Sequence, residues 1–177
     1  MGIYLTENEI QGFYEEFSTP ENVIRHCRAV AHVAVTVAEA LNEHGYDLDI
    51  DMIRGAALVH DAARTKARHW DVVADRLVDM GHYEESIIVR NHMMGTGYSP
   101  IESVNEMDMI WIGDRTVKED EYVGIDERFE YIAEKARKMG ADEKHLEQIE
   151  GSKQEMQNLL DAIGEVIGQS VDSLLRD

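Results

Sequence analysis

The sequence has little of several features that would restrict what the protein can be. A single cysteine, Cys27, excludes an internal disulfide framework and fits a reducing compartment. Only two residues are proline, so long helices are permitted throughout most of the chain. No apolar run approaches the roughly 18 residues that a membrane-spanning helix needs. The first residues, MGIYLTENEIQGFYEEF, also lack the basic and apolar regions of a signal peptide. We therefore expect a cytoplasmic protein that does not bind membranes.

Positive charge is also scarce. The chain has 17 Lys and Arg residues against 36 Asp and Glu residues, which gives a net charge of −19. The resulting field repels nucleic-acid backbones and anionic membrane surfaces, so neither is an expected partner. The same balance suits a site that attracts divalent cations.

Helical periodicity dominates what is present. Residues 6–17 begin with a capping-box pattern, Thr6 followed by Glu9. Residues 52–64 are apolar on nearly all sides, which predicts a central helix. Across residues 18–45, apolar positions recur every three or four residues, at Val23, Cys27, Val30, Ala34, Val37 and Leu41. Further helices are predicted at 68–81, 84–94, 101–117, 126–140 and, as one or two helices, at 142–175. We predict one all-α domain over residues 1–177.

Five polar residues lie on helical faces that are otherwise apolar. His60 and Asp61 are adjacent in the stretch ALVHDAART, residues 56–64, and His26 lies at the edge of the stripe described above. His92 and Asp114 each follow an isoleucine by four positions. A buried, unpaired carboxylate is costly, so both aspartates need partners.

Two interpretations of these residues compete. In the first, they are ordinary core groups: each imidazole donates to a carbonyl, and each carboxylate pairs with Arg64, Arg115 or a helix N-terminus. In the second, imidazoles and carboxylates from separate helices meet around a metal ion. Histidine nitrogen and aspartate oxygen are suitable ligands for Mn, Fe, Co, Ni or Zn, and helical bundles build such sites in their cores.

The order His26, His60-Asp61, Asp114 resembles the HD superfamily of metal-dependent phosphohydrolases. RHCRAVAHVA is similar to the family's first-histidine helix, ALVHDAAR to its HD helix, and IWIGDRTV to the helix with its last aspartate. The resemblance covers roughly residues 20–137. It implies a helical HD bundle, with residues 1–19 and 138–177 as flanking helices.

The sequence looks most similar to small HD domains that occur alone or fused to molybdenum-cofactor nucleotidyltransferase-like domains. ARHWDVVADRL and IIVRNHM also resemble HD-type symmetrical dinucleoside tetraphosphate hydrolases, in which two further histidines complete a binuclear site. The resemblance implies a first metal held by His26, His60, Asp61 and Asp114, and a second held by His69 and His92, with Asp61 bridging. The sequence departs from the family at two lysines. Family members often have a lysine a few residues after HD, where this chain offers Arg64 or Lys66, and Arg115 stands where a lysine often follows the last aspartate. In a third departure, GD replaces the usual AD of the last helix.

The implied activity is cleavage of a phosphate ester of a nucleotide or other small molecule by metal-activated water. Asp61 would be catalytic, and Arg64, Lys66 or Arg115 would neutralise developing charge. One or two divalent ions are expected, from among Mn, Fe, Ni, Co, Mg and Zn. The alternatives are a di-iron HD-type oxygenase and a non-catalytic nucleotide- or metal-binding module. We also consider a homodimer formed through the long C-terminal helix. The remaining histidines, His32, His44, His82 and His145, are expected at the surface, and GTGYSP, residues 95–100, is either a lid or an ordinary loop.

Overall fold

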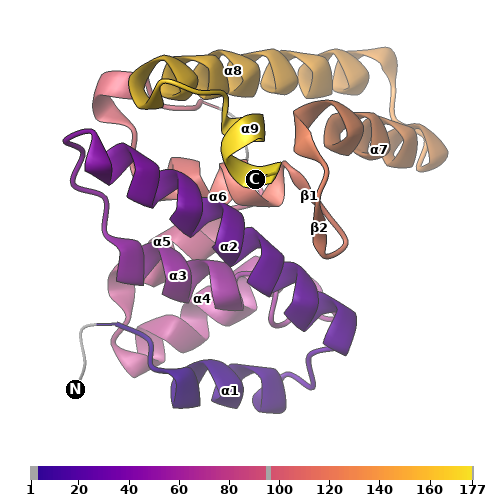
Figure 1. The fold of residues 1–177 in the computed structure, drawn as a ribbon. Helices are drawn as coiled ribbons and strands as arrows, with labels where there is room; N and C mark the ends of the chain where they lie inside the picture. The colour runs from indigo at the N-terminus through magenta and orange to yellow at the C-terminus, as the bar shows by residue number, and fades with distance from the viewer. Residues whose placement is uncertain (1–3, 95–96, 177) are drawn as a thin grey trace.

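The computed structural model describes residues 4–94 and 97–176 and is mainly helical, as predicted (Figure 1). The elements are α1 (Glu7–Glu16), α2 (Glu21–Glu43), α3 (Ile50–Val59), α4 (His69–Met80), α5 (Tyr83–Asn91), the 3₁₀ helix η1 (Ile101–Ser103), α6 (Glu106–Asp114), β1 (Val117–Lys118), β2 (Glu121–Tyr122), α7 (Gly124–Lys138), α8 (Glu143–Ile167) and α9 (Val171–Arg176). Of the loop GTGYSP, Gly95 and Thr96 lie outside the described residues, so its role as a lid stays a prediction.

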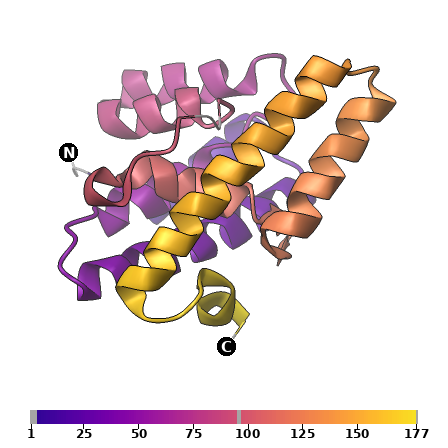
Figure 2. The same cartoon turned by 90° about the horizontal axis from the view of Figure 1, so that it is seen from above.

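Helix α2 is the centre of the bundle. It packs against both α3 and α6, while α4 and α5 form a pair on the far side of α3 in Figure 1. Helices α7 and α8 lie side by side across the top of the molecule, as the view from above shows (Figure 2). The bundle therefore consists of α2 to α6, and the terminal helices cover it from below and above.

The predicted stripe of α2 accounts for its central place. Five of its six residues are buried, including Cys27, and Val23 is half-buried at the start of the helix. The capping box at the start of α1 is also present, because Thr6 accepts from the Glu9 amide and the Glu9 carboxylate accepts from the Thr6 amide. These local patterns were sufficient to predict α1 and α2. The predicted helix 101–117 instead divides into η1 and α6, and α6 begins only at Glu106, after its cap Asn105.

Two helices end earlier than their apolar patterns predict. Helix α3 ends at Val59 and continues as a series of tight turns, in which amides at 62, 64 and 66 bond to carbonyls three residues earlier. Helix α6 ends at Asp114, and the Thr116 hydroxyl donates back to the Ile112 carbonyl at 2.6 Å. A short hairpin, β1–β2, then replaces the end of the predicted helix 101–117.

Helices α2 and α6 touch at Gly113. A methyl group at this position would lie 2.7 Å from the Val30 carbonyl oxygen, closer than real side chains approach a backbone. The glycine that replaces the alanine of the family pattern therefore permits this crossing. It places Asp114, the next residue, directly beside α2.

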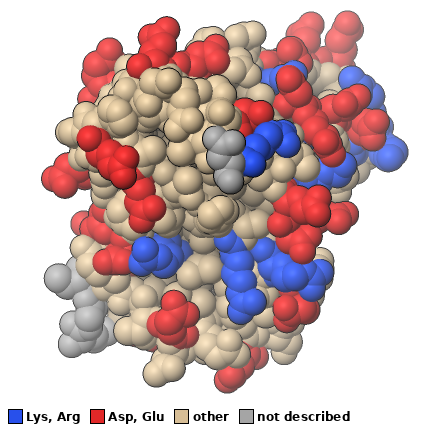
Figure 3. Space-filling model, in the orientation of Figure 1, with Lys and Arg blue, Asp and Glu red and all other residues tan. Residues whose placement is uncertain are grey.

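The surface reflects the acidic composition. On the face shown in Figure 3, Asp and Glu side chains are spread around the edges, and Lys and Arg side chains are fewer. One prediction about the surface is wrong: His82 is only 3% exposed, with Glu9 and Glu85 carboxylate oxygens 3.5 and 3.7 Å from its ring nitrogens. No helix in the described ranges is both long enough and apolar enough to cross a membrane.

Candidate metal centre

Six side chains of ligand type meet where several helices end. They are His26 in the second turn of α2, His60 and His92 at the C-caps of α3 and α5, Asp61 two residues beyond the end of α3, His69 at the start of α4 and Asp114 at the end of α6. The early end of α3 explains how adjacent residues can serve one site. Neighbours within a helix point about 100° apart, whereas His60 and Asp61 lie where the helix gives way to turns.

The six groups are almost completely removed from solvent. Relative exposures are 0% for His60, 2% for Asp61, 6% for His69, 1% for His92 and 7% for Asp114, and the His26 side chain is 13% exposed. Burial at this level is unusual for charged residues without partners. The contacts among these groups are therefore decisive for what the site can bind.

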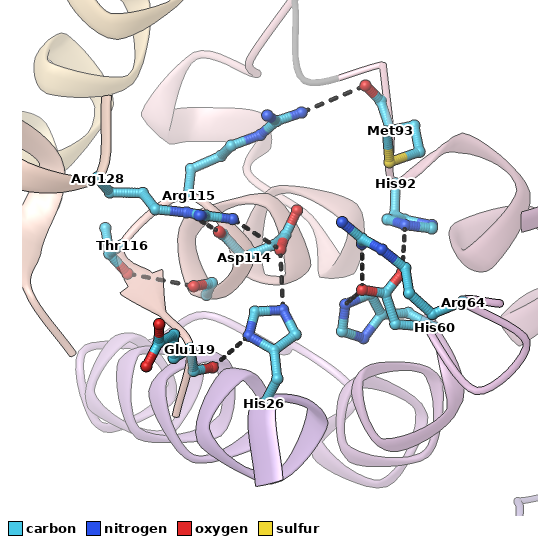
Figure 4. A network of polar contacts seen from close by, with 12 residues as sticks. His26, His60, Arg64, His92, Met93, Asp114, Arg115, Thr116, Glu119 and Arg128 are labelled. Carbon is cyan, nitrogen blue, oxygen red and sulfur yellow. Dashed lines mark hydrogen bonds and ion pairs between the residues drawn. The ribbon is translucent and has the colours of Figure 1, made fainter. Parts of the chain in front are cut away.

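Three of the imidazoles are oriented in the same way. In each, Nδ1 lies 2.7 Å from a backbone carbonyl: His60 from that of Ala57 and His92 from that of Val89, both three residues earlier. The third, His26, bonds to the carbonyl of Glu119, far along the chain (Figure 4). Because a carbonyl only accepts, each Nδ1 must carry the proton, which leaves the Nε2 lone pair of the neutral ring free.

The free nitrogens face carboxylate oxygens. Within the described residues, the Nε2 atoms of His60, His69 and His92 and Oδ1 of Asp61 are buried and have no hydrogen-bond partner. Nε2 of His69 lies 2.8 Å from Oδ1 of Asp61, but the two atoms lack the alignment of a hydrogen bond. Buried polar atoms without partners are rare and costly, so a cluster of four of them fits the binding of a positive ion at this place.

The ligand atoms form two overlapping groups. His26, His60 and Asp114 make one, and His60, Asp61 and His92 make the other, with all ligand atoms in a group within 4.8 Å of one another. One Nε2 lone pair can bind only one ion, so His60 cannot serve two ions. The carboxylate of Asp61 can, because it has two oxygens.

The two oxygens of Asp61 face opposite parts of the site. Oδ2 lies 3.8 Å from Nε2 of His60, and Oδ1 lies 2.8 Å and 3.5 Å from the Nε2 atoms of His69 and His92. Below, His26, His60 and Asp114 are called the Asp114 side, and His69 and His92 the His92 side, with Asp61 between them. The sequence resemblance implies the same division of ligands, and that assignment stays a prediction.

Electrostatics keep these groups in the protonation state that metal ligands require. Burial lowers the pKa of His60 from 6.5 to about 4, so the imidazole is neutral at neutral pH. Burial alone would raise the pKa of Asp61, but the neighbouring imidazoles and the Arg64 guanidinium hold it well below 3.8. Burial likewise opposes the ionisation of Asp114, yet contact with His26 and the charge of Arg115 lower its pKa.

His26 behaves differently from His60. Its burial lowers the pKa, but the adjacent Asp114 and Asp61 carboxylates outweigh that effect and raise it above 6.5. Nε2 of His26 lies 3.2 Å from Oδ1 of Asp114. A proton on that nitrogen and a metal ion would therefore compete for the same place.

Of the three predicted cations, two lie at the site. Arg64 pairs with Oδ2 of Asp61, and its side chain is 43% exposed. Arg115 follows Asp114 and donates to the Met93 carbonyl at 3.2 Å, while its Nε has no partner within the described residues. Lys66 is exposed and forms no side-chain hydrogen bond or ion pair within the described residues.

Two contributors were missed by sequence reasoning. Arg128 of α7 reaches Asp114, with Nε donating to its carbonyl at 3.1 Å and Nη2 lying 3.7 Å from Oδ1 (Figure 4). The Glu119 carbonyl, which orients His26, belongs to the unpredicted hairpin. Nothing in the amphipathic pattern around Arg128 marks it as different from other cations of its helix. A backbone carbonyl leaves no trace in side-chain identity.

Comparisons with known proteins find similarity over part of this chain. Residues 23–96 match the family model of the HD domain. Over 87 residues the chain is 31% identical to an uncharacterized protein of Methanocaldococcus jannaschii. The aligned stretch covers 48% of this chain and 52% of that protein. The chain thus spans about half the length of the curated relative that it matches. No solved structure is significantly similar.

Residues 23–96 therefore match the HD-domain family, as the sequence resemblance predicted. The matched segment includes five of the six ligand-type residues but ends before Asp114. Asp114, the sixth residue of ligand type, is brought to the others by α6, outside the matched segment.

Proposed function

We propose that this HD-domain protein is a metal-dependent phosphohydrolase that cleaves phosphate esters of a nucleotide or another small molecule. The observation that carries the proposal is the shared orientation of three buried imidazoles, each with Nδ1 tied to a carbonyl and Nε2 aimed at a carboxylate. Such backbone acceptors are the usual outer partners of metal-binding histidines.

The residues fit a pair of divalent ions. One ion would be held by His26, His60, Asp114 and one oxygen of Asp61, and the other by His69, His92 and the second oxygen. The mixture of neutral imidazole and carboxylate suits Mn, Fe, Co, Ni or Zn better than Mg, which favours oxygen ligands alone. When bound, such ions supply an activated water nucleophile and polarise a phosphoryl oxygen.

Three arginines support an anionic substrate at this place. Burial lowers the pKa of Arg128, and Arg115 and Arg64 are close enough that their charges lower it further. Arg64 and Arg128 hold the carboxylates of Asp61 and Asp114, respectively. Among the residues that the structure describes, no carboxylate forms an ion pair with Arg115, so we propose that it neutralises charge on the phosphoryl group in the transition state. Arg64 could assist when it leaves Asp61, and Lys66 stays a weaker candidate.

An acidic protein that binds phosphate needs a local positive site. With two divalent ions and three arginines against Asp61 and Asp114, this centre would be positive although the chain carries −19 overall. The rest of the surface would still repel polyanions such as nucleic acids. We therefore propose a small phosphorylated substrate.

The proposal is tested by removing and restoring metal. The chelator-treated protein should release no phosphate from phosphate monoesters, nucleotides or dinucleoside polyphosphates, and Mn²⁺ or Ni²⁺ should restore release from at least one class. Metal binding without hydrolysis of any of these would contradict the proposal and favour a binding module. About two irons per chain with a mixed-valence absorption band would instead favour an oxygenase.

A further inference from the structure

The β1–β2 hairpin makes an unusual contact with the metal centre. Val117 pairs with Tyr122 and Lys118 with Glu121, so Glu119 and Asp120 form its two-residue turn. The turn lies against the N-terminal half of α2 (Figure 4 shows Glu119 beside His26). Two successive turn residues thereby meet two successive helix residues.

The contact has two points. Arg25 donates from Nε to Oδ2 of Asp120 at 2.9 Å, and His26 donates from Nδ1 to the Glu119 carbonyl at 2.7 Å. The base of the hairpin is fixed separately, because Val123 and Gly124 amides both bond to the Thr116 carbonyl. The turn is therefore held at its tip and at its base.

Glu119 adopts a conformation that its type disfavours. Its φ of +56° lies in the left-handed region, which most residues with a Cβ avoid. Its carboxylate is exposed, so the side chain does not explain its position. The backbone conformation instead sets the direction of the carbonyl that meets His26.

Without that carbonyl, His26 would have a better alternative. Nε2 lies 3.2 Å from Oδ1 of Asp114, so a neutral ring free to choose its tautomer would place its proton on Nε2 and donate to the carboxylate. In that tautomer no lone pair faces the Asp114 side. His60 and His92 do not face the same choice, because carbonyls of their own helices hold Nδ1.

We propose that the hairpin is a positioning element for His26: the Glu119 carbonyl, held by the left-handed turn and the Arg25–Asp120 pair, selects the Nδ1–H tautomer and keeps Nε2 free to bind metal. The inference rests on the proposed function for its consequence, since only a metal-binding site needs that lone pair. The tautomer itself can be measured whether or not metal binds.

A matched pair of substitutions at one position tests the proposal. Glu119→Gly and Glu119→Val remove the same carboxylate, but glycine adopts positive φ freely and valine, being β-branched, strongly resists it. Long-range ¹H–¹⁵N spectra of the metal-free protein, recorded at alkaline pH where His26 is neutral, report the tautomer. We expect Nδ1–H in the wild type and in Glu119→Gly, and a shift toward Nε2–H in Glu119→Val.

Metal binding gives the second readout. Mn²⁺ titration should show about tenfold weaker binding to the Asp114 side in Glu119→Val and unchanged binding in Glu119→Gly, as expected for loss of an outer partner. Arg25→Gln breaks the other point of contact, and Arg28→Gln, an exposed neighbour on α2, is its control. If Glu119→Val does not fold, the comparison of Arg25→Gln with Arg28→Gln tests the positioning role through the same two measurements.

The possible outcomes separate the two proposals. Retention of the Nδ1–H tautomer in both Glu119→Val and Arg25→Gln would overturn the positioning role, whatever happens to thermal stability. A wild-type protein that binds no Mn²⁺ would instead overturn the proposed function. The tautomer contrast between valine and glycine would then still decide what the hairpin does.

Discussion

The two sides of the centre draw on different lengths of the chain. The ligand-type residues of the His92 side, with Asp61, come from one stretch, residues 61–92. Those of the Asp114 side lie between residues 26 and 114, and the carbonyl of residue 119 orients His26. The His92 imidazole takes its orienting carbonyl from its own helix, and its exposure is 1%. The His26 imidazole takes its carbonyl from a hairpin 93 residues away, and its side chain is 13% exposed.

The difference shows how one centre can be built by two routes. The His92 side lies within the matched HD segment and depends mainly on where α3, α4 and α5 begin and end. The Asp114 side depends on tertiary contacts: the Gly113 crossing, the Arg128 contact and the Glu119 carbonyl. We therefore expect the Asp114 side to be the more easily disturbed.

The largest effect is expected where the two sides join. Asp61→Asn removes the charge of the bridging carboxylate and leaves Arg64 without its partner. The rate of hydrolysis should fall by more than about 100-fold, which exceeds the usual cost of losing an outer-shell partner. The number of metal ions bound per chain should fall below two. Steady-state rates and elemental analysis measure both. Asp75→Asn, on a side chain that is 72% exposed and paired with Arg90, should leave both unchanged; equal losses in the two variants would contradict the bridging role.

The next test separates the sides. His92→Gln should lose the ion of the His92 side and keep the other, and His26→Gln should do the reverse, each with about a 10- to 100-fold loss of activity. Mn²⁺ titration of each variant gives the stoichiometry, expected to fall from two ions to one. If either substitution removes both ions, the two sides do not act as separate sites.

Acid should weaken the folded protein before it protonates the carboxylates. The folded-state pKa of His60 is about 4 against 6.5 for an ordinary histidine, so its contribution to stability is full above pH 6.5. That contribution is lost as the pH falls toward 4, because the unfolded chain then binds a proton that the folded chain excludes. Urea unfolding of metal-free protein between these pH values should show the decline. In His60→Gln the decline should be much shallower, and an identical slope would show that another group is responsible.

The smallest effect concerns the crossing of α2 and α6. Gly113→Ala forces a methyl group against the Val30 backbone and should cost about 1–3 kcal/mol of stability, with weaker Mn²⁺ binding confined to the Asp114 side. Gly12→Ala, on an open and exposed position of α1, should instead stabilise the protein by up to about 1 kcal/mol. Thermal unfolding of the two variants measures the contrast, and a Gly113→Ala protein as stable as the wild type would contradict the close approach.

Much of this molecule follows from local pattern. The three- and four-residue spacing of apolar positions predicts α2. His26 and Asp114 lie three or four residues from apolar positions of their helices, and the same spacing therefore places them on inward faces. The early ends of α3 and α6 could not be predicted, because their apolar runs continue beyond the last helical residue. Those ends depend on hydroxyl and turn hydrogen bonds, such as that of Thr116, that compete with the helix.

The ligand-type residues of the candidate centre can be predicted from the sequence, but the groups that hold them in position are harder to predict. His69 and His92 were implied by family resemblance, and the structure brings both beside Asp61. The contact of Arg128 and the carbonyl of Glu119 depend on how α7 and the hairpin dock, which no short-range spacing encodes. The ligand roles of all six residues stay predictions until metal is observed.

The central claim is that divalent ions occupy both sides of Asp61. Crystals grown with Mn²⁺ would test it directly through an anomalous difference map. We expect two peaks, one among His26, His60, Asp61 and Asp114 and one among Asp61, His69 and His92. The absence of any peak at these side chains, in crystals that take up Mn²⁺ elsewhere or not at all, would contradict it.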